Sequence, residues 1–372
     1  MKNAKNIFLT VGGTGGHIYP GLALAQELLE RNPGIACSFV IDKKPIVESI
    51  FKKEGYKTYR VDASPFPRNK FWQICRFLYK TAKGLAVSML LLKQKKPDLV
   101  IAFGAYISVP VVLSAYFLKI PVILHEQNYF PGMANRFLSF MAARIAISYE
   151  ESRDYFPPGK TVVTGNPVRK ELFDADRKEA LDYFNLDDEK TTILIFGGSQ
   201  GARSINQAVY SLIPYLESVS EEIQIIHVSG QRSDKQIIKE YKKYRLNALV
   251  YTYLERMEYA YKLADIVIAR AGATTIAEIS AQAIPTIFIP YPHASARHQY
   301  FNARPLCDKG LAICFPEKKL SGAGLAVRLI PLLTDARRRR SMAEGYKKYS
   351  QNFKGAAGRL AEVVEKELRI LK

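Results

Sequence analysis

The chain has 372 residues, of which 48% are hydrophobic, and its 54 lysines and arginines outnumber 35 aspartates and glutamates, which gives a formal charge of +19. A chain of this length can bury large cores and suggests two domains, so it needs no disulfides and is not a small cross-linked scaffold. The positive charge predicts an anionic partner and leaves nucleic acid, a membrane surface and phosphorylated substrates open.

The cysteines and the N-terminus predict a protein of the reducing cytoplasm. No metal-ligand spacing relates the four cysteines, and we expect no disulfide among Cys37, Cys75, Cys307 and Cys314. The first apolar run is too short for a signal peptide. Residues 99–118 are uncharged and as long as a membrane span, but Gly104, Ser108 and Pro110 predict a strand over 99–103, a turn and a short helix instead.

The chain opens with a predicted strand over residues 6–11, a glycine turn over 12–17 and a helix over 22–29 that a Pro-Gly pair introduces. G-x-G-x-x-G fits no frame of the turn, and Asp42 after the next strand leaves a nicotinamide site weakened but not excluded. His17 lies at the mouth of the turn. Its imidazole could accept a proton near pH 7 or could be structural, and the residues alone leave both open.

The stretch over 63–97 holds eight lysines or arginines and no acid, interleaved with aromatic and aliphatic residues. Arg76, Lys80 and Lys83 fall at i, i+4 and i+7, so one face of the predicted helix is basic. That pattern suits an interfacial helix at an anionic membrane, or an ordinary core helix with a solvated basic face. No nucleic-acid-binding motif accompanies these charges.

Two similar glycine turns indicate a pseudo-repeat. The second, over 197–202, follows a predicted strand over 192–196 and precedes a helix, half a chain after the first turn. We therefore predict two α/β, Rossmann-like domains with parallel sheets, an N-terminal one over 1–165 and a C-terminal one over 166–350. Residues 351–372 form an amphipathic helix that we expect to pack back on the N-terminal domain.

Residues 266–303 predict a strand, a turn at Gly272, a helix from Thr274 or Thr275, a second strand and a polar loop. Open amides at such a helix start can bind a phosphate. Glu278 lies one turn into the helix. There it forms a capping box with Thr275 or accepts hydrogen bonds from the two hydroxyls of a ribose.

Polar loops follow the predicted strands over 122–124 and 286–289. The carboxyl ends of strands are where open α/β sheets bind ligands, although a solvated loop has the same composition. The residues concerned are Glu126, Asn128 and Asn135 in the first loop, and Arg297, His298, Gln299 and Asn302 in the second.

Six blocks occur in the order GGTGGHIYPGLALAQEL, HEQN, GNPVR, GGSQGARSIN, RAGATTIAEI and HQYFNA. Together they resemble the signature blocks of the MurG family. The resemblance implies a glycosyltransferase B fold, in which two Rossmann-like domains face each other across a cleft. It also implies an inverting enzyme that moves N-acetylglucosamine from UDP-N-acetylglucosamine to the 4-hydroxyl of undecaprenyl-pyrophosphoryl-N-acetylmuramoyl-pentapeptide, converting lipid I to lipid II in peptidoglycan synthesis.

The resemblance further implies a peripheral protein on the cytoplasmic face of the bacterial cell membrane. Its expected partners are UDP-N-acetylglucosamine, lipid I, an anionic membrane surface and proteins of cell-wall synthesis, and no nucleic acid. No cofactor or metal is expected. Asp174 and Asp176 form the Asp-x-Asp pattern of metal-dependent glycosyltransferases, but no apolar strand precedes them and we expect them at the surface.

Residue roles carried over from the resemblance concern the donor, the acceptor, the chemistry and the membrane. His17 is the expected general base, with Glu126 as the alternative. The expected donor-binding residues are Thr14, Gly15, Gly16, Asn128, Arg169, Ser199, Gln200, Gly272, Ala273, Thr274, Glu278 and Gln299. Asn135, His298 and Asn302 are expected in the acceptor site or cleft, although family members often have Gln where His298 stands. The expected membrane patch comprises Phe71, Trp72, Arg76, Phe77, Lys80 and Lys83.

Four alternatives remain at this stage. A diacylglycerol glycosyltransferase needs the same nucleotide-sugar site and a similar membrane face. A UDP-N-acetylglucosamine epimerase shares the architecture but does not explain the basic aromatic stretch. A nucleotide-sugar-binding scaffold predicts UDP binding without turnover, and a nucleic-acid binder predicts salt-sensitive oligonucleotide binding that UDP does not displace.

Overall fold

A computed structural model describes residues 5–43, 45–64, 71–198, 201–230, 235–350 and 353–370, with only the main chain at 45, 46, 71–73, 295 and 370. The predicted donor residues Ser199 and Gln200 and the side chains of Phe71 and Trp72 lie outside this description. The chain divides into two compact units. Unit 1 comprises residues 1–168 and 355–372, and unit 2 comprises residues 169–354.

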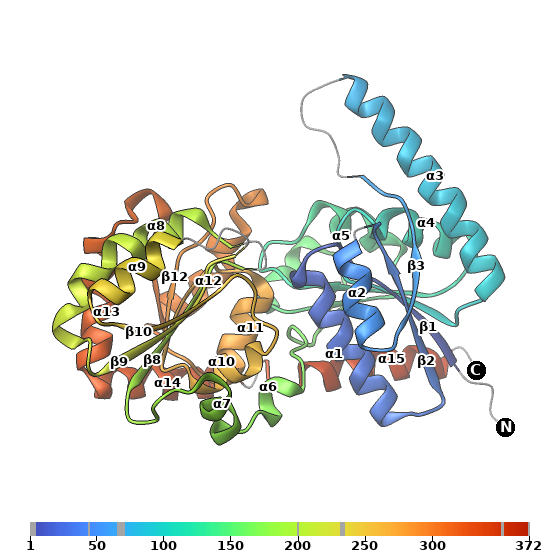
Figure 1. The fold of residues 1–372 in the computed structure, drawn as a ribbon. Helices are drawn as coiled ribbons and strands as arrows, with labels where there is room; N and C mark the ends of the chain where they lie inside the picture. The colour runs from blue at the N-terminus through green and yellow to red at the C-terminus, as the bar shows by residue number, and fades with distance from the viewer. Residues whose placement is uncertain are drawn as a thin grey trace. The chain divides into compact units, whose positions relative to one another are not determined.

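Among the described residues, unit 1 is built on a seven-stranded parallel sheet of order β3-β2-β1-β4-β5-β6-β7 (Figure 1). The chain reverses its direction of strand addition between β1 and β4, and such a switch point is where open α/β sheets bind ligands. Most of these strands are apolar runs buried on both faces, as expected for a covered parallel sheet. The strands are β1 (Lys5–Thr10), β2 (Ile35–Ile41), β3 (Lys57–Arg60), β4 (Leu99–Ala102), β5 (Val122–Glu126), β6 (Arg144–Ile147) and β7 (Thr161–Val163).

Two apolar clusters cover the two faces of this sheet. Ile7 and Leu9 belong to one cluster and Phe8 to the other, because successive side chains of a strand point to opposite faces. The helices around them are α1 (Gly15–Arg31), α2 (Pro45–Lys53), α3 (Phe71–Lys95), α4 (Ser108–Phe117), α5 (Met133–Leu138) and α15 (Ala356–Ile370), with the 3-10 helices η1 (Ser139–Met141) and η2 (Glu150–Tyr155).

Helix α15, at the end of the chain, belongs to unit 1 and packs against α1. Leu360 and Val364 are fully buried in the cluster that also contains the β1 side chains Ile7 and Leu9. The Arg359 side chain donates a hydrogen bond to the main-chain oxygen of Thr164 at 3.0 Å. The C-terminal helix therefore completes the core of the unit that begins the chain.

Among the described residues, unit 2 is built on a six-stranded parallel sheet of order β10-β9-β8-β11-β12-β13, which is the Rossmann order. Its strands are β8 (Thr191–Phe196), β9 (Ile223–Val228), β10 (Asn247–Tyr251), β11 (Ile266–Ala269), β12 (Thr286–Phe288) and β13 (Ala312–Cys314). Its helices are α6 (Glu171–Asp174), α7 (Arg177–Phe184), α8 (Arg203–Leu212), α9 (Lys235–Lys243), α10 (Met257–Leu263), α11 (Ala273–Gln282), α12 (His298–Asp308), α13 (Gly322–Thr334) and α14 (Ala336–Tyr349), with the 3-10 helices η3 (Ile213–Val219), η4 (Ser295–Arg297) and η5 (Glu317–Lys319).

The predicted start of the first helix is wrong. Helix α1 begins at Gly15 with Thr14 as its N-cap, and Pro20 lies inside it. The main-chain oxygen of Thr14 accepts hydrogen bonds from the amides of His17 and Ile18 at 3.0 and 3.2 Å, so the glycine turn passes directly into helix. His17 consequently lies in the first turn of α1 rather than in a loop before it.

The uncharged stretch over 99–118 folds as predicted, with β4 followed by a turn and by α4. Within the described part of the chain, no helix combines the length and the apolarity that crossing a membrane requires. The basic helix α3 packs against α4 and extends beyond the rest of unit 1 at its N-terminal end (Figure 1). It exposes Leu78, Tyr79 and Leu90 to 58%, 68% and 60%.

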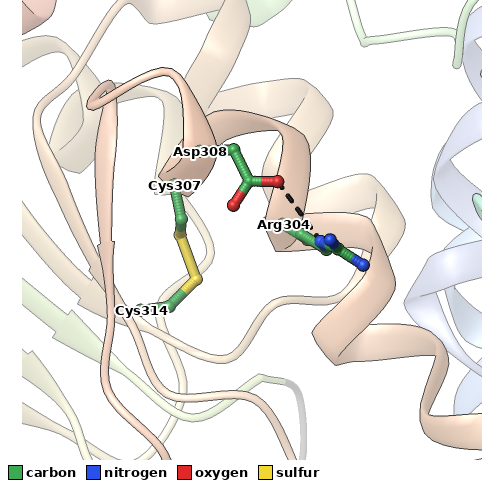
Figure 2. Close-up of a disulfide and its surroundings, with 4 residues drawn as sticks. All are labelled: Arg304, Cys307, Asp308 and Cys314. Carbon is green, nitrogen blue, oxygen red and sulfur yellow. Dashed lines mark hydrogen bonds and ion pairs between the residues drawn. A yellow bond between two sulfur atoms is a disulfide. The ribbon is translucent and has the colours of Figure 1, made fainter.

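The expectation that no disulfide forms is wrong. Cys307, near the end of α12, is joined to Cys314, the last residue of β13, with 6.0 Å between their Cα atoms (Figure 2). Gly310, with φ +69°, lies in the turn between them and helps bring the strand back beside the helix. The ion pair of Arg304 with Asp308, at 3.2 Å, lies on the same helix. Spacing did not reveal this pair because the turn, rather than a sequence motif, brings the sulfurs together.

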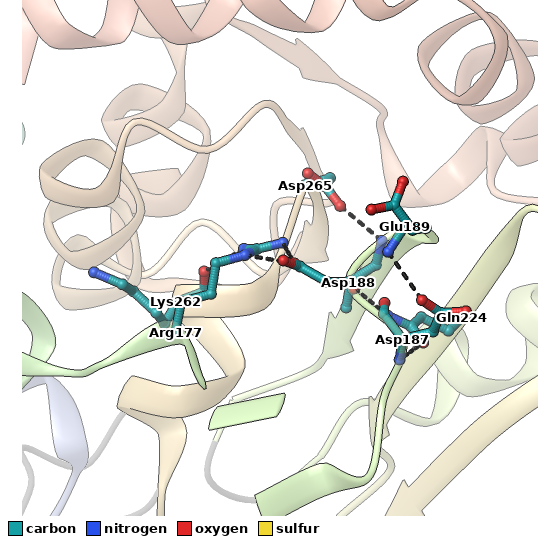
Figure 3. A network of polar contacts seen from close by, with 8 residues as sticks. Arg177, Asp187, Asp188, Glu189, Gln224, Lys262 and Asp265 are labelled. Atoms are coloured by element: carbon teal, nitrogen blue, oxygen red, sulfur yellow. Dashed lines mark hydrogen bonds and ion pairs between the residues drawn. The ribbon is translucent and has the colours of Figure 1, made fainter. Parts of the chain in front are cut away.

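A polar network lies at the amino edge of the unit 2 sheet, where the strands begin (Figure 3). Gln224 is fully buried on β9, where its amide donates to the main-chain oxygen of Asp187 at 2.6 Å and to the Thr192 hydroxyl at 2.9 Å. Its Oε1 accepts from the Asp187 amide at 3.0 Å. Asp265 accepts from the Thr192 amide at 2.8 Å, and burial raises the pKa of its carboxyl.

Gln224→Leu is expected to lower the unfolding free energy by about 2 kcal/mol, because it leaves buried polar groups of Asp187 and Thr192 unpaired. Chemical denaturation measures this, with Gln207→Leu on the exposed face of α8 as the matched control. The network lies at the edge of the sheet opposite the glycine turns, so the folded variant should keep its ligand affinity. An unchanged denaturation midpoint would contradict this account of Gln224.

Candidate active site

Polar residues gather at the carboxyl edge of each sheet. In unit 1 these residues follow β1 and β5, the two strands that flank β4 in the sheet. In unit 2 they follow β8, β11 and β12. Each unit therefore places polar side chains where parallel α/β sheets bind ligands.

In unit 1, His17 is half-buried beside the glycine turn after β1. A Cβ at Gly12 would lie 2.5 Å from the Cβ of Ala105 and 3.0 Å from the Cδ2 of His17, so only glycine fits between them. The imidazole thus packs directly on the main chain of the turn, on the first turn of α1. The turn fixes where this side chain lies.

His125, near the end of β5, is fully buried. Its Nε2 lies 3.0 Å from the main-chain oxygen of Gly165, and its Nδ1 lies 3.1 Å from the side-chain nitrogen of Gln127. Burial lowers its pKa to about 4, and the nearby His17 contributes in the same direction. His125 is therefore neutral near pH 7 and is held at both ring nitrogens.

Glu126 is 1% exposed and accepts hydrogen bonds from four donors. Oε1 accepts from the amide and the side chain of Asn128, both at 3.0 Å. Oε2 accepts from the Gly132 amide at 3.0 Å and from the Asn135 side chain at 2.9 Å. Burial raises the pKa of this carboxyl, while these hydrogen bonds act against the rise. The arrangement fixes the loop over 127–132 and orients Asn128 and Asn135.

In unit 2, the start of α11 follows β11 through Arg270, Ala271 and Gly272. Gly272 is the N-cap, no side chain caps the helix, and its first turn holds no acid. Ala273 and Thr274 are nearly buried in that turn. The start of this ten-residue helix therefore resembles the helix N-termini that bind anions, where main-chain amides and the helix dipole both favour negative charge.

Glu278 lies beyond this first turn and is 7% exposed. Its Oε2 accepts from the Tyr261 hydroxyl at 3.0 Å, and its Oε1 lies 3.9 Å from an Arg169 nitrogen. Burial raises the pKa of the carboxyl, and Arg169 and Tyr261 oppose the rise. The capping-box interpretation is wrong, because the helix starts at Ala273 and Thr275 lies within it.

The loop after β12 leads into α12 through two left-handed residues, Ala296 and Arg297, with φ +49° and +53°. Gln299 lies in the first turn, and its Oε1 accepts from the Tyr291 amide at 2.9 Å, which orients the side-chain amide. His298 is half-buried at the start of the helix, and Asn302 is fully buried one turn later. The helix start therefore places these residues together in unit 2.

Arg270 is a buried residue of this site that the sequence analysis missed. Its guanidinium donates to the main-chain oxygen of Ile289 at 3.0 Å and to the Ser204 hydroxyl at 2.9 Å, and it forms an ion pair with Glu317. It also lies 5.2 Å from the Tyr291 ring centroid. The Arg270 side chain therefore connects four elements, namely the end of β11, the end of β12, the start of α8, and η5. The signal was a charged residue directly after the apolar strand IVIA.

Arg270→Gln is expected to raise the KM for a ligand of unit 2 by about tenfold, with a smaller effect on kcat, because losing a charged hydrogen-bond donor costs about 1.5–3 kcal/mol. Arg270→Lys keeps the charge but cannot span Ile289 and Ser204 together, so it should recover only part of the loss. Steady-state kinetics with the ligand varied measure this, with Arg304→Gln at an exposed position of α12 as the control. Equal KM values in Arg270→Gln and wild type would refute the positioning role.

The Asp-x-Asp pattern lies at the surface, as predicted. Asp174 and Asp176 are both exposed, and Asp176 caps α7 by accepting from the Glu179 amide at 3.0 Å. Within the described ranges, no group of three or more His, Cys, Asp or Glu side chains could hold a metal ion. Asp176 therefore has a structural use at the start of α7.

Comparison with known proteins gives consistent matches over both units. The glycosyltransferase family 28 N-terminal domain matches residues 7–147, and its C-terminal domain matches residues 192–359. The UDP-N-acetylglucosamine--N-acetylmuramyl-(pentapeptide) pyrophosphoryl-undecaprenol N-acetylglucosamine transferase of Halothermothrix orenii is 40% identical, over 92% of this chain and 94% of that protein. The enzyme of the same name from Thermodesulfovibrio yellowstonii is 35% identical over 98% and 99%. A crystal structure of Acinetobacter baumannii MurG superposes with a TM-score of 0.75 at 28% identity, over 97% of this chain and 99% of that one.

Proposed function

The chain belongs to glycosyltransferase family 28 and, within it, to the MurG family with its glycosyltransferase B fold, and from this premise we propose that it transfers N-acetylglucosamine from UDP-N-acetylglucosamine to the 4-hydroxyl of undecaprenyl-pyrophosphoryl-N-acetylmuramoyl-pentapeptide. The enzyme is a transferase that takes a UDP-sugar as donor. The observation that carries the proposal is the uncapped start of α11 with Glu278 buried beyond its first turn.

Unit 2 binds the donor in this proposal. The amides of Gly272, Ala273 and Thr274 face the diphosphate, and the Glu278 carboxylate accepts from the ribose hydroxyls. Arg169, 3.9 Å from Glu278, adds positive charge on the same side. Gln299 and Asn302 hold hydroxyls of the sugar, and His298 precedes them at the start of the same helix, where it could contact the acceptor. Ser199 and Gln200, which follow β8, stay proposed donor residues on the resemblance alone.

The leaving group is UDP, whose diphosphate gains negative charge as the bond to the anomeric carbon breaks. Helix-terminal amides and a guanidinium stabilise such charge without reorganising during the reaction. The start of α11 and Arg169 supply these groups in unit 2. No step of this mechanism requires a metal ion.

Unit 1 binds the acceptor and provides the base. His17 accepts the proton of the attacking 4-hydroxyl, which then attacks the anomeric carbon from the face opposite UDP and inverts its configuration. Thr14, Gly15 and Gly16 place the backbone of the turn against the substrates. Glu126 has both oxygens occupied by donors, so it acts by holding Asn128 and Asn135 in place.

The lipid acceptor requires access to a membrane surface, and α3 supplies a suitable face. Arg76 and Lys83 are exposed on this helix beside Leu78, Tyr79 and Leu90. Phe77 and Lys80 are half-buried, and Phe71 and Trp72 begin the helix. Cationic side chains beside exposed apolar ones favour binding to anionic lipids at a bacterial membrane.

The test is transfer of radiolabelled N-acetylglucosamine from its UDP donor to a polyprenyl-pyrophosphoryl muramoyl-pentapeptide, with diacylglycerol as a second acceptor in the same assay. We expect transfer to the muramoyl lipid and none to diacylglycerol. Transfer only to diacylglycerol would keep the donor site but refute the proposed acceptor. UDP binding without transfer to either lipid would refute the proposed reaction.

A further inference from the structure

A pocket of roughly 500 Å³ lies within unit 1, between α5 with η1 on one side and the end of η2 on the other. This is within the range of about 300–1,000 Å³ that is usual for ligand pockets. Its apolar wall includes Met133, Phe137 and Phe140, and Tyr155 lies in the wall from η2. None of these residues has a role in the mechanism above.

Helix α5 and η1 expose apolar side chains on the pocket face. Met133, Phe137 and Phe140 are 68%, 56% and 74% exposed, whereas Asn135 and Leu138 on the opposite face are buried. Positions 133, 136, 137 and 140 follow the i, i+3, i+4, i+7 spacing of one helical face. A contiguous exposed apolar face of this kind marks a binding surface more often than isolated exposed residues do.

The pocket also has a cationic side. Arg136 is exposed on the same helical face and lies 6.0 Å from the Tyr155 ring centroid. Lys160 donates to the main-chain oxygen of Phe140 at 2.9 Å, which keeps a second positive charge near the rim. The lining holds one cation, Arg136, and one acid, Asp154, and Lys160 adds a further positive charge beside it. An apolar pocket with a positive rim is complementary to an apolar chain that ends in an anionic group.

The pocket shares α5 with the proposed acceptor site. Asn135 points inward from α5 and donates to Glu126 at 2.9 Å and to the His125 main-chain oxygen at 3.0 Å. Arg136, the next residue, faces the pocket. A substrate that contacts both faces of this short helix would have a polar head at Asn135 and an apolar tail beside Phe137.

We propose that this pocket binds the isoprene units next to the pyrophosphate of the lipid acceptor, and that Arg136 contacts the pyrophosphate itself. The proposal rests on the proposed function, because the acceptor of that reaction joins a sugar, a pyrophosphate and a polyprenyl chain. A single molecule of this kind accounts for the apolar wall, the cationic rim and the shared helix. The pocket thereby gives the enzyme a preference for the lipid chain that is separate from membrane binding by α3.

The experiment compares acceptors with the same muramoyl-pentapeptide head and a methyl, geranyl or geranylgeranyl group on the pyrophosphate, all in one detergent. For the wild type, the acceptor KM should fall at least about tenfold from methyl to geranyl, since burying only about two methylene groups of the geranyl chain in the pocket is enough for a change of this size. In Phe137→Ser and Phe140→Ser the ratio of these KM values should approach one. Phe117→Ser, equally exposed on α4 but outside the pocket, should keep the wild-type ratio.

Arg136→Gln should raise the KM for all three acceptors alike, and Arg136→Lys should restore part of the loss, because the contact is with the pyrophosphate. A full geranyl preference in Phe137→Ser would overturn the proposal. A second result would also overturn the proposal. If Phe137→Ser kept the geranyl preference but no longer bound acceptor-free anionic vesicles, the apolar face of α5 would contact the membrane instead of the acceptor.

Direct binding separates this proposal from the proposed function. Calorimetry should detect geranyl diphosphate binding to the wild type, much weaker binding of inorganic diphosphate, and loss of geranyl diphosphate binding in Phe137→Ser. If no acceptor is glycosylated but this pattern holds, the reaction assigned above is wrong and the prenyl diphosphate pocket stands. If transfer occurs but geranyl diphosphate binds wild type and Phe137→Ser equally, the pocket assignment fails alone.

Discussion

Glu278→Gln is expected to raise the KM for UDP-N-acetylglucosamine by at least about 100-fold, because hydrogen bonds from two hydroxyls to a charged acceptor contribute about 1.5–3 kcal/mol each. The carboxylate is buried, and its contacts with Tyr261 and Arg169 fix its orientation before the donor arrives. Steady-state kinetics with varied donor and fixed acceptor measure the effect. Donor binding measured without acceptor should fall by a similar factor.

A donor that lacks one ribose hydroxyl tests the contact itself. The wild type should bind the deoxyribose donor more weakly than the normal donor. Glu278→Gln should bind the two donors almost equally, since the carboxylate that accepts from the missing hydroxyl is already absent in this variant. Glu258→Gln is the matched control, because Glu258 is 8% exposed on the neighbouring helix α10 and pairs with Arg256. Independent, additive losses from the variant and the deoxy donor would show that Glu278 does not bind the ribose.

The stability of Glu278→Gln distinguishes loss of a ligand contact from loss of the fold. Because burial raises the folded-state pKa of Glu278, this group favours folding most at pH values below its unfolded pKa, and that contribution is lost as the pH rises through the folded pKa. Near pH 7.5 the buried carboxylate therefore costs stability. The glutamine variant should melt at the same or a higher temperature than the wild type there, and the difference should shrink as the pH is lowered toward 5.

Many of the strands could be predicted, because a buried parallel strand is a short apolar run between turns. Residues 266–269 were predicted as a strand and form β11, and the uncharged stretch over 99–118 was correctly divided into strand and helix. Pro20 misled the prediction of α1, since proline usually marks the first turn of a helix rather than its interior. Local chemistry therefore predicted the elements better than it predicted their ends.

The site could be predicted only where a local pattern carries the chemistry. The predicted phosphate-binding turn follows from a glycine between a strand and a helix, and α11 begins directly after Gly272. The partners of Glu278 and the ties made by Arg270 depend on side chains far away in sequence, so spacing favoured a capping box and missed the arginine. The Cys307–Cys314 bridge was missed for a different reason, because the turn between the helix and the strand, rather than a sequence motif, brings the two sulfurs together.

The geometry of unit 1 supports different roles for its two candidate catalytic residues. Four donors surround the Glu126 oxygens, and a carboxylate in that position would have to break hydrogen bonds to accept a proton. His17 instead lies half-buried against the glycine turn, at the carboxyl edge of the sheet, which is where open α/β sheets bind ligands. We therefore expect a general base at His17 and a positioning group at Glu126.

His17→Gln is expected to lower kcat by about 100- to 10,000-fold with little change in the donor KM, since general bases contribute about this much and the donor is held by unit 2. The pH dependence is the diagnostic measurement. In the wild type, kcat should fall at acid pH as the base becomes protonated, and in His17→Gln this acid limb should disappear. Glu126→Gln should retain the acid limb while raising the acceptor KM, because an amide nitrogen would face the donors that now hold the loop. An acid limb that persists in His17→Gln and vanishes in Glu126→Gln would reverse the two assignments and make Glu126 the base.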